Sequence, residues 1–161
     1  MTGISARLFL AVCFLAVAPG SFARAEEQLV WTETASAGFV SLAYGALDPA
    51  KPPLFLLSCF NAMSIAVLDL RTEMAEAKPG QPLTIALSAG DAKAPVEGEA
   101  ARDDATGVTF AEASDIAVKP VLEVLRQSGP LTVKIGEASA ALSDQGRAEA
   151  VEKFSGDCKL D

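Results

Sequence analysis

Four carboxylates lie close together in the middle of the chain, and they are the residues best placed to do chemistry. They are Glu97, Glu99, Asp103 and Asp104, with Arg102 among them. The spacing of the two glutamates would place both on one face of a strand, with the aspartates in the adjoining turn. Such a group could supply the acid and base of glycoside hydrolysis or hold a calcium ion. The interpretation that we favour is a solvent-exposed edge strand whose charges oppose aggregation.

Several catalytic classes are excluded by residue types that the chain lacks. It has no histidine, which excludes Ser-His-Asp and Cys-His catalysis and every imidazole metal site. It has no GxGxxG, SxxK or CxxC motif, and serines such as Ser143 and Ser155 have no histidine to activate them. We therefore expect no catalytic residue, no metal, no cofactor and no enzymatic activity.

The chain is acidic, with 21 acidic and 13 basic residues and a net charge of −8 at neutral pH. A protein of this charge repels phosphate backbones and anionic lipid surfaces, so we expect no nucleic-acid partner. The charge favours cationic partners, although solubility alone is a sufficient reason for it.

The first 25 residues have the three parts of a secretory signal. Arg7 is followed by an apolar stretch over residues 8–18, and the small residues Ala23 and Ala25 precede Glu26. An apolar stretch of about 11 residues is too short to cross a bilayer, which requires about 20. The sequence thus predicts a cleaved signal over residues 1–25 and a periplasmic or secreted product over residues 26–161. We expect this product to be one β-rich domain without a transmembrane anchor.

Two of the three cysteines remain after signal cleavage, because Cys13 lies in the signal. Cys59 lies near the end of the most apolar strand, and Cys158 follows a helix that must pack on the same core. In an oxidising compartment this arrangement predicts a disulfide between them. Two free buried thiols or a disulfide between chains are the alternatives.

Short apolar segments separated by turn residues indicate eight or nine strands. Residues 54–60 are nearly all apolar, which is typical of a strand covered on both faces, and they are our candidate for the central strand. The predicted strands span residues 29–32, 38–44, 54–60, 63–70, 83–87, 96–100, 108–111, 131–135 and 139–142.

Two helices are expected in the last third of the chain. In the first, near residues 118–128, apolar residues recur at intervals of three and four, and Gly129 and Pro130 end it. The second, near residues 144–155, would carry Ala148, Val151 and Phe154 on one stripe. The predicted fold class is α+β, a mainly antiparallel sheet or sandwich with these two helices.

The large aromatic side chains are expected in the core, because a domain of this size has few others to fill it. Trp31 and Tyr44 also carry polar groups, so one of them could lie on a binding surface. The aromatic residues after the signal are Trp31, Phe39, Tyr44, Phe55, Phe60, Phe110 and Phe154.

Parts of the chain resemble two families of small periplasmic proteins. Residues 53–61 and the following strand are similar to the middle of the type VI secretion-associated accessory family, where a proline, an apolar strand ending in cysteine and a further strand recur. Residues 121–158 resemble the tail of invasion-associated locus B proteins, with a helix, two strands, a glycine-started helix and a cysteine in that order. The chain departs from the first family near residues 96–104, where a Tyr-Arg-hydrophobic-Asp stretch is missing. It departs from the second at Ala141 and Leu142, which stand where a phenylalanine is expected. The resemblance implies a disulfide-closed, non-enzymatic envelope domain.

Three functions fit the sequence. The first is a secreted or periplasmic binding or accessory domain of the cell envelope, whose partner is a protein or an envelope component. The alternatives are a carboxylate-dependent hydrolase and a small enzyme inhibitor that uses a protruding loop, for which residues 48–53 are the candidate. A hydrolase needs two carboxyl groups about 5–9.5 Å apart in one cleft. A binding domain instead shows an exposed apolar patch with dispersed acids.

Overall fold

Nine antiparallel strands form one continuous sheet in the structure, a computed structural model that describes residues 28–72, 74 and 76–160. The strands lie in the order β1-β2-β3-β4-β7-β6-β5-β8-β9. They are β1 (Leu29–Ser36), β2 (Phe39–Ala46), β3 (Phe55–Phe60), β4 (Ile65–Leu70), β5 (Pro82–Ala89), β6 (Ala92–Arg102), β7 (Thr109–Ser114), β8 (Leu131–Ile135) and β9 (Ala138–Leu142). The helices are α1 (Val118–Leu125) and α2 (Arg147–Asp157).

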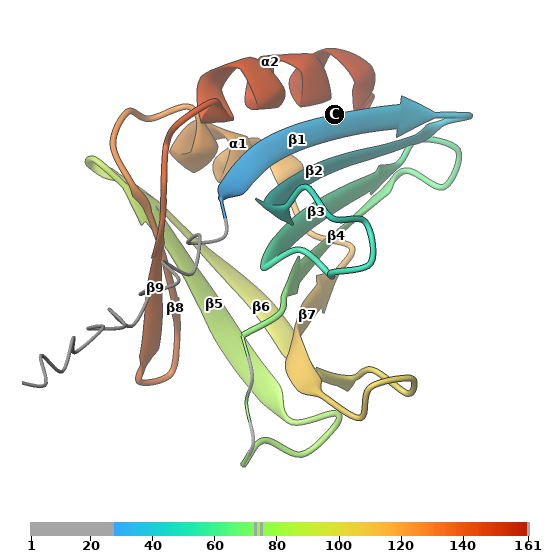
Figure 1. Ribbon diagram of the computed structural model, residues 1–161, viewed down its shortest axis with the longest axis vertical. Coiled ribbons are helices and arrows are strands. Elements are labelled where there is room, and N and C mark those ends of the chain that lie inside the picture. Colours follow the sequence, from blue (N-terminus) through green and yellow to red (C-terminus); the bar gives the residue numbers. More distant parts are fainter. Residues whose placement is uncertain (1–27, 73, 75, 161) are drawn as a thin grey trace, which may run out of the picture.

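The sheet is strongly curved and forms a half-barrel (Figure 1). Strands β6 and β7 meet at one end of the molecule and diverge toward the other, where the two helices lie. Helix α1 packs on β5 and β6, and α2 packs on β1 and β2. The predicted antiparallel sheet with two helices is therefore present, but as one curved sheet rather than a sandwich.

The strands occur where the apolar pattern predicts them, and several are longer. Strand β6, for example, spans Ala92–Arg102, whereas residues 96–100 were expected. The prediction that residues 54–60 form the central strand is wrong, because β3 is third in the order and the middle position belongs to β7. The outer face of β3 is also only partly covered, at Leu56 and Phe60. A run of apolar residues predicts that a strand is buried, but it does not predict the position of that strand in the sheet.

The core lies on the concave face of the sheet, beneath the two helices. Alternation along each strand directs one set of side chains inward, and in β4 the buried residues are Ala66, Leu68 and Leu70. The largest apolar side chains that are almost fully buried come from both halves of the sheet and from the helices: Phe55, Phe154, Leu42, Leu57, Leu68, Leu70, Ile85, Leu87, Leu125, Leu131 and Val121.

Helix α1 buries the predicted apolar face but ends at Leu125, and Gly129 has the left-handed φ of 85° expected of a glycine stop. Helix α2 begins at Arg147 rather than near residue 144, because Gly146 has a φ of 79° that is incompatible with a helix. The predicted stripe is wrong at Ala148, which is exposed. The buried stripe is Arg147, Ala150, Val151 and Phe154, whose spacing of three, four and seven follows one helix face.

Gly98 lies where β6 and β7 separate. The pairing of these strands runs from Arg102 opposite Thr109 to Glu99 opposite Glu112 and ends there. A Cβ atom at Gly98 would collide with the backbone oxygen of Glu112 and lie 3.0 Å from the Cβ of Ala113. The close approach of the two backbones thus requires a residue without a side chain.

Replacing Gly98 with alanine is expected to lower the free energy of unfolding by about 1–3 kcal/mol, because a backbone atom cannot move aside as a side chain can. Urea denaturation of the purified protein measures this. The matched control is Gly156→Ala, because Gly156 lies in α2 with no atom within 4 Å of an added Cβ. That variant should be more stable by up to about 1 kcal/mol. An equal change in the free energy of unfolding for the two variants would contradict a close approach of the β6 and β7 backbones at Gly98.

Candidate functional site

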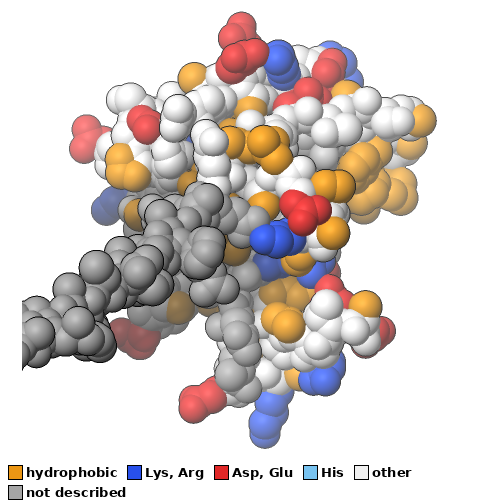
Figure 2. All heavy atoms as spheres, in the orientation of Figure 1, with side chains coloured by type: hydrophobic (Ala, Val, Ile, Leu, Met, Phe, Trp, Pro, Cys, Tyr) orange, Lys and Arg blue, Asp and Glu red, His pale blue; other side chains and the backbone are white. Residues whose placement is uncertain are grey.

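An apolar patch is exposed at the end of the sheet where β1 turns into β2 and β3 turns into β4. We call it the tip patch; it consists of Phe39, Phe60, Met63 and Ile65. Phe39 is paired with Phe60, and Phe60 with Ile65, so the three lie in one row on the outer face of the sheet. Phe39 and Met63 are 37% and 60% exposed. Figure 2 shows hydrophobic side chains gathered at this end of the molecule.

The two aromatic rings of the tip patch were expected in the core. Instead they contact each other on the outer face, with ring centroids 5.1 Å apart. Their strand neighbours Val40 and Cys59 point inward and are buried, so alternation directs the two phenylalanines outward. This exposure follows from the strand alternation and is not a packing defect.

The tip patch lies on a firmly held part of the fold. Cys59 forms a disulfide with Cys158, with Cα atoms 5.7 Å apart. Asn61 donates from Nδ2 to the carbonyl of Asp157 and accepts from the backbone N–H of Lys159, at 2.9 and 2.8 Å. Its own backbone N–H donates to the carbonyl of Gly38. The β1–β2 turn, the β3–β4 turn and the end of α2 are therefore joined beside the patch.

Trp31 and Tyr44 are both buried, so neither supplies the binding surface that their polar groups suggested. Their rings contact each other at 5.1 Å, and Trp31 also contacts Phe55. The indole N–H donates to the carbonyl of Ser143 at 2.6 Å, and the Tyr44 hydroxyl accepts from the N–H of the same residue. These bonds join β1 and β2 to the segment that follows β9.

The predicted acidic cluster is divided by the structure. Glu97 and Glu99 are exposed on the outer face of β6, as their spacing predicts. Asp103 and Asp104 lie past the end of the strand, and six residues of extended chain separate Asp103 from Glu97 by about 20 Å. The four carboxylates therefore do not form one site.

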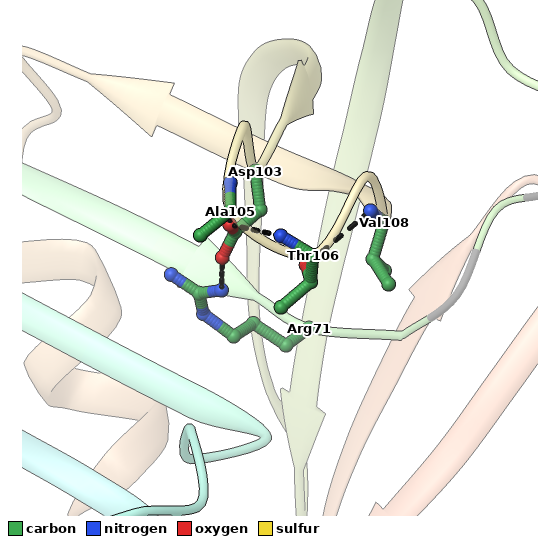
Figure 3. A network of polar contacts seen from close by, with 5 residues as sticks. All are labelled: Arg71, Asp103, Ala105, Thr106 and Val108. Atoms are coloured by element: carbon green, nitrogen blue, oxygen red, sulfur yellow. Dashed lines mark hydrogen bonds and ion pairs between the residues drawn. The ribbon is translucent and has the colours of Figure 1, made fainter.

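Asp103 organises a turn and pairs with Arg71 (Figure 3). Its Oδ2 lies 2.7 Å from the guanidinium of Arg71, and its Oδ1 accepts from the backbone N–H groups of Ala105 and Thr106. The hydrogen bond from Arg71, followed by that from Thr106, holds the pKa of Asp103 below its usual value. The Arg71 guanidinium also lies 4.6 Å from the ring centroid of Phe110. This network holds the strand ends in place, so the contacts of Asp103 indicate a structural role.

Strand pairing instead brings together three carboxylates that are far apart in the sequence. Asp69 of β4 is opposite Glu112 of β7, and Glu112 is opposite Glu99 of β6. Directly opposed residues have Cβ atoms about 4.5–5.5 Å apart, where like charges destabilise a sheet. Sequence analysis identified Glu99 alone, because strand register was needed to find its neighbours.

Asp69 is the carboxylate that the fold disturbs most. Burial, and after it the neighbouring charge of Glu112, raise its pKa to about 6, although Arg71 acts in the opposite direction. Its Oδ1 is buried without a hydrogen-bond partner in the described part of the chain. Ionised Asp69 should therefore destabilise the folded protein.

The replacement Asp69→Asn is expected to stabilise the protein at pH 7.5 and to leave it unchanged at pH 4. Because the folded-state pKa lies above that of the unfolded chain, the cost of ionisation is absent below about pH 4 and grows as the pH rises through about 6. Partial exposure screens the effect, and we expect a gain of about 1–2 kcal/mol. Urea denaturation at the two pH values measures it, with the exposed Glu123→Gln as control. A gain that is the same at both pH values would rule out ionisation as the cause.

A shallow hollow of about 240 Å³ on the outer face is lined by Glu97, Glu99, Glu112 and neighbouring residues. Two of its carboxylates, Glu99 and Glu112, are directly opposite each other in the sheet. In the described ranges, no three Asp, Glu or Cys side chains are placed so that they could hold a metal ion.

The loop proposed for an inhibitor is exposed between β2 and β3. The Asp48 carbonyl accepts from the N–H of Lys51 at 3.0 Å, and its side chain accepts from the N–H of Ala50, which makes a tight turn. Leu47 beside it is 71% exposed. The loop is therefore exposed and contains a tight turn held by its own hydrogen bonds.

The N-terminal segment predicted to be a signal, with Cys13 and Glu26, lies outside the described residues. Over the residues that are described, neither helix has the length and apolar character needed to cross a membrane. Comparison with protein-family models, curated proteins and solved structures finds no match to this chain.

Proposed function

We propose that the chain is a non-enzymatic binding domain of the cell envelope and that the tip patch contacts a partner protein. The observation that carries the proposal is an aromatic pair on the outer face, with Phe39 exposed and Phe60 half-buried, at a corner that the disulfide joins to α2. Proteins that act alone rarely leave large apolar side chains grouped in this way, and such groups mark interaction surfaces.

The composition of the tip patch suits protein recognition. Phenylalanine and methionine are enriched in protein interfaces, where aromatic rings supply contact area and methionine adapts to irregular shapes. Asn61 and the nearby disulfide hold the two turns in place before binding. A preformed surface loses less conformational entropy on association.

The hydrolase alternative depends on Glu99 and Glu112. They face each other across β6 and β7 and line the same hollow. The hollow lies on the outer face and not in a deep cleft, which is why we favour binding over catalysis. Assays of the purified protein with glycan and ester substrates test this, and turnover abolished by Glu99→Gln or Glu112→Gln would support the hydrolase.

Photo-cross-linking tests the proposed surface directly. A photoreactive phenylalanine analogue at position 39 or 63 should cross-link to a partner protein in the exporting cell. The same analogue at position 47, which is more exposed than Phe39 or Met63 but lies outside the tip patch, should not. Cross-links of the same partner from position 47 and none from position 39 would place the interface elsewhere and favour the inhibitor loop.

We also propose that the protein is exported and begins at Glu26, as the signal pattern predicts. The Cys59–Cys158 disulfide supports this, because disulfides persist mainly outside the cytoplasm. N-terminal sequencing of protein from the periplasm or medium should read from Glu26. Protein that retains Met1, or that is acylated at Cys13, would contradict the proposed processing.

A further inference from the structure

Strand β6 has an open edge over its first half. The register of β5 and β6 is continuous, and the backbone N–H of Ala100 donates to the carbonyl of Gln81 on the β5 side. Because hydrogen-bonding direction alternates along a strand, the backbone groups of Lys93, Pro95 and Glu97 point the other way, toward β7. Pairing with β7 ends at Glu99, so these groups have no strand partner among the described residues.

A cavity of about 350 Å³ lies against this edge, and we call it the β6 notch. Residues 94–97 of β6 line one side, and residues 114–117 with Pro120 and Val121 line the other. Val96 and Val121 belong to the core beneath it, and the accessible apolar residues of its wall are Ile116, Ala117 and Pro120. The volume is at the lower end of the range of ligand sites, about 300–1,000 Å³. An open strand edge beside a cavity can receive an extended segment, and Pro95, which has no N–H, suits an edge strand.

The rim of the β6 notch is acidic. Glu97 and Asp115 line it, and the adjoining hollow, which shares Glu97 and Ser114 with it, adds Glu99 and Glu112. No lysine or arginine of the described chain lines either cavity. The hydrogen bonds of Glu97 and Glu112 come from the hydroxyl groups of Thr84 and Ser114, which are uncharged donors.

We infer that the β6 notch binds an extended segment of a partner protein in which lysine or arginine alternates with a small apolar residue. The segment would add a strand to β6, as in other cases of β-strand addition. Its apolar side chains would face Ile116, Ala117 and Pro120, and its cationic side chains would lie on the outer face against Glu97, Glu99 and Glu112. The inference rests on the open edge and its charges, and it is independent of the tip patch.

A peptide with the sequence Lys-Val-Lys-Val-Lys-Val tests the inference with the full-length oxidised protein. Its binding, measured by fluorescence anisotropy, should be at least tenfold tighter than that of Lys-Lys-Lys-Val-Val-Val, which has the same charge but cannot alternate. The combined variant Glu97→Gln, Glu99→Gln, Glu112→Gln should weaken binding about tenfold, or about 1.4 kcal/mol. The matched control changes Glu123, Glu137 and Glu152, three exposed glutamates on other surfaces, to glutamine and should bind as the unchanged protein does.

Amide hydrogen exchange separates strand addition from charge attraction alone. In the free protein, the amides of Lys93 and Glu97 should exchange faster than those of Ala94 and Val96, which face β5. The alternating peptide should slow exchange at Lys93 and Glu97. Equal binding of the two peptides, an unchanged affinity of the glutamine variant, or no protection of these two amides would overturn the inference.

Discussion

Replacing both Cys59 and Cys158 with alanine is expected to lower the free energy of unfolding by about 2–5 kcal/mol. The disulfide joins residues 99 apart in the sequence. Closing a loop of about 100 residues restricts the unfolded chain by up to about 4.7 kcal/mol in the chain-entropy model. This is a large part of the stability of a small domain, about 5–15 kcal/mol.

The loss should be localised in the folded state. Cys158 directly follows α2, and the disulfide joins the end of that helix to β3. Relative to the natural protein, the double variant should therefore show a larger increase in amide hydrogen exchange in α2 than in β3. Adding a reductant should destabilise the natural protein to the same extent and have no effect on the variant. Equal stability of the reduced and oxidised forms would contradict this account of the C-terminus.

Replacing Arg147 with methionine is expected to cost about 3 kcal/mol, the second-largest effect. The guanidinium is 1% exposed and donates to the carbonyls of Leu125, Gln127 and Gly129. These carbonyls end α1 and the turn after it. The bond to Leu125 is buried and the bonds to Gln127 and Gly129 are part-buried, so removal of the donor leaves the Leu125 carbonyl unsatisfied in the core. Burial lowers the pKa of Arg147, with Asp144 opposing this change, so the fold accepts a desolvated cation to close that helix.

Arg147→Lys should recover only part of the loss, because an ammonium group cannot donate a planar fork to several carbonyls. The control in the same helix is Lys153→Ala. Lys153 forms an exposed ion pair with Glu149 at 2.8 Å, and its removal should cost less than about 0.5 kcal/mol. Urea denaturation measures all three variants. A loss for Arg147→Met no larger than for Lys153→Ala would show that the buried hydrogen bonds do not stabilise the fold.

Most of the secondary structure could be predicted from the sequence, because alternation and three-to-four spacing leave a local record. In Ile65–Leu70, alternation predicts two faces, and the structure shows that Ala66, Leu68 and Leu70 are the buried one. The Cys59–Cys158 disulfide could also be predicted, since these are the two cysteines that follow the predicted signal. The helix boundaries were predicted less well. Helix α2 begins at Arg147 and not near residue 144, because Gly146 adopts a left-handed conformation.

The surface features could not be predicted, because they depend on strand order and register. Glu99 and Glu112 become neighbours only through the pairing of β6 with β7. Phe39 and Phe60 look like core residues until the inward direction of Val40 and Cys59 fixes their side. Arg147 left one usable signal, a cation in the first turn of a helix, where the helix dipole disfavours it.

Quantitative affinity capture from the extracytoplasmic fraction tests the central claim, that the tip patch binds a partner protein. The natural protein is compared with Phe39→Ser/Met63→Ser and with Leu47→Ser, which changes a more exposed apolar residue outside the patch. We predict one protein that is recovered equally with the natural protein and Leu47→Ser and at least tenfold less with the double variant. Equal recovery of every captured protein by all three, with the double variant folded as judged by its urea midpoint, would contradict the claim.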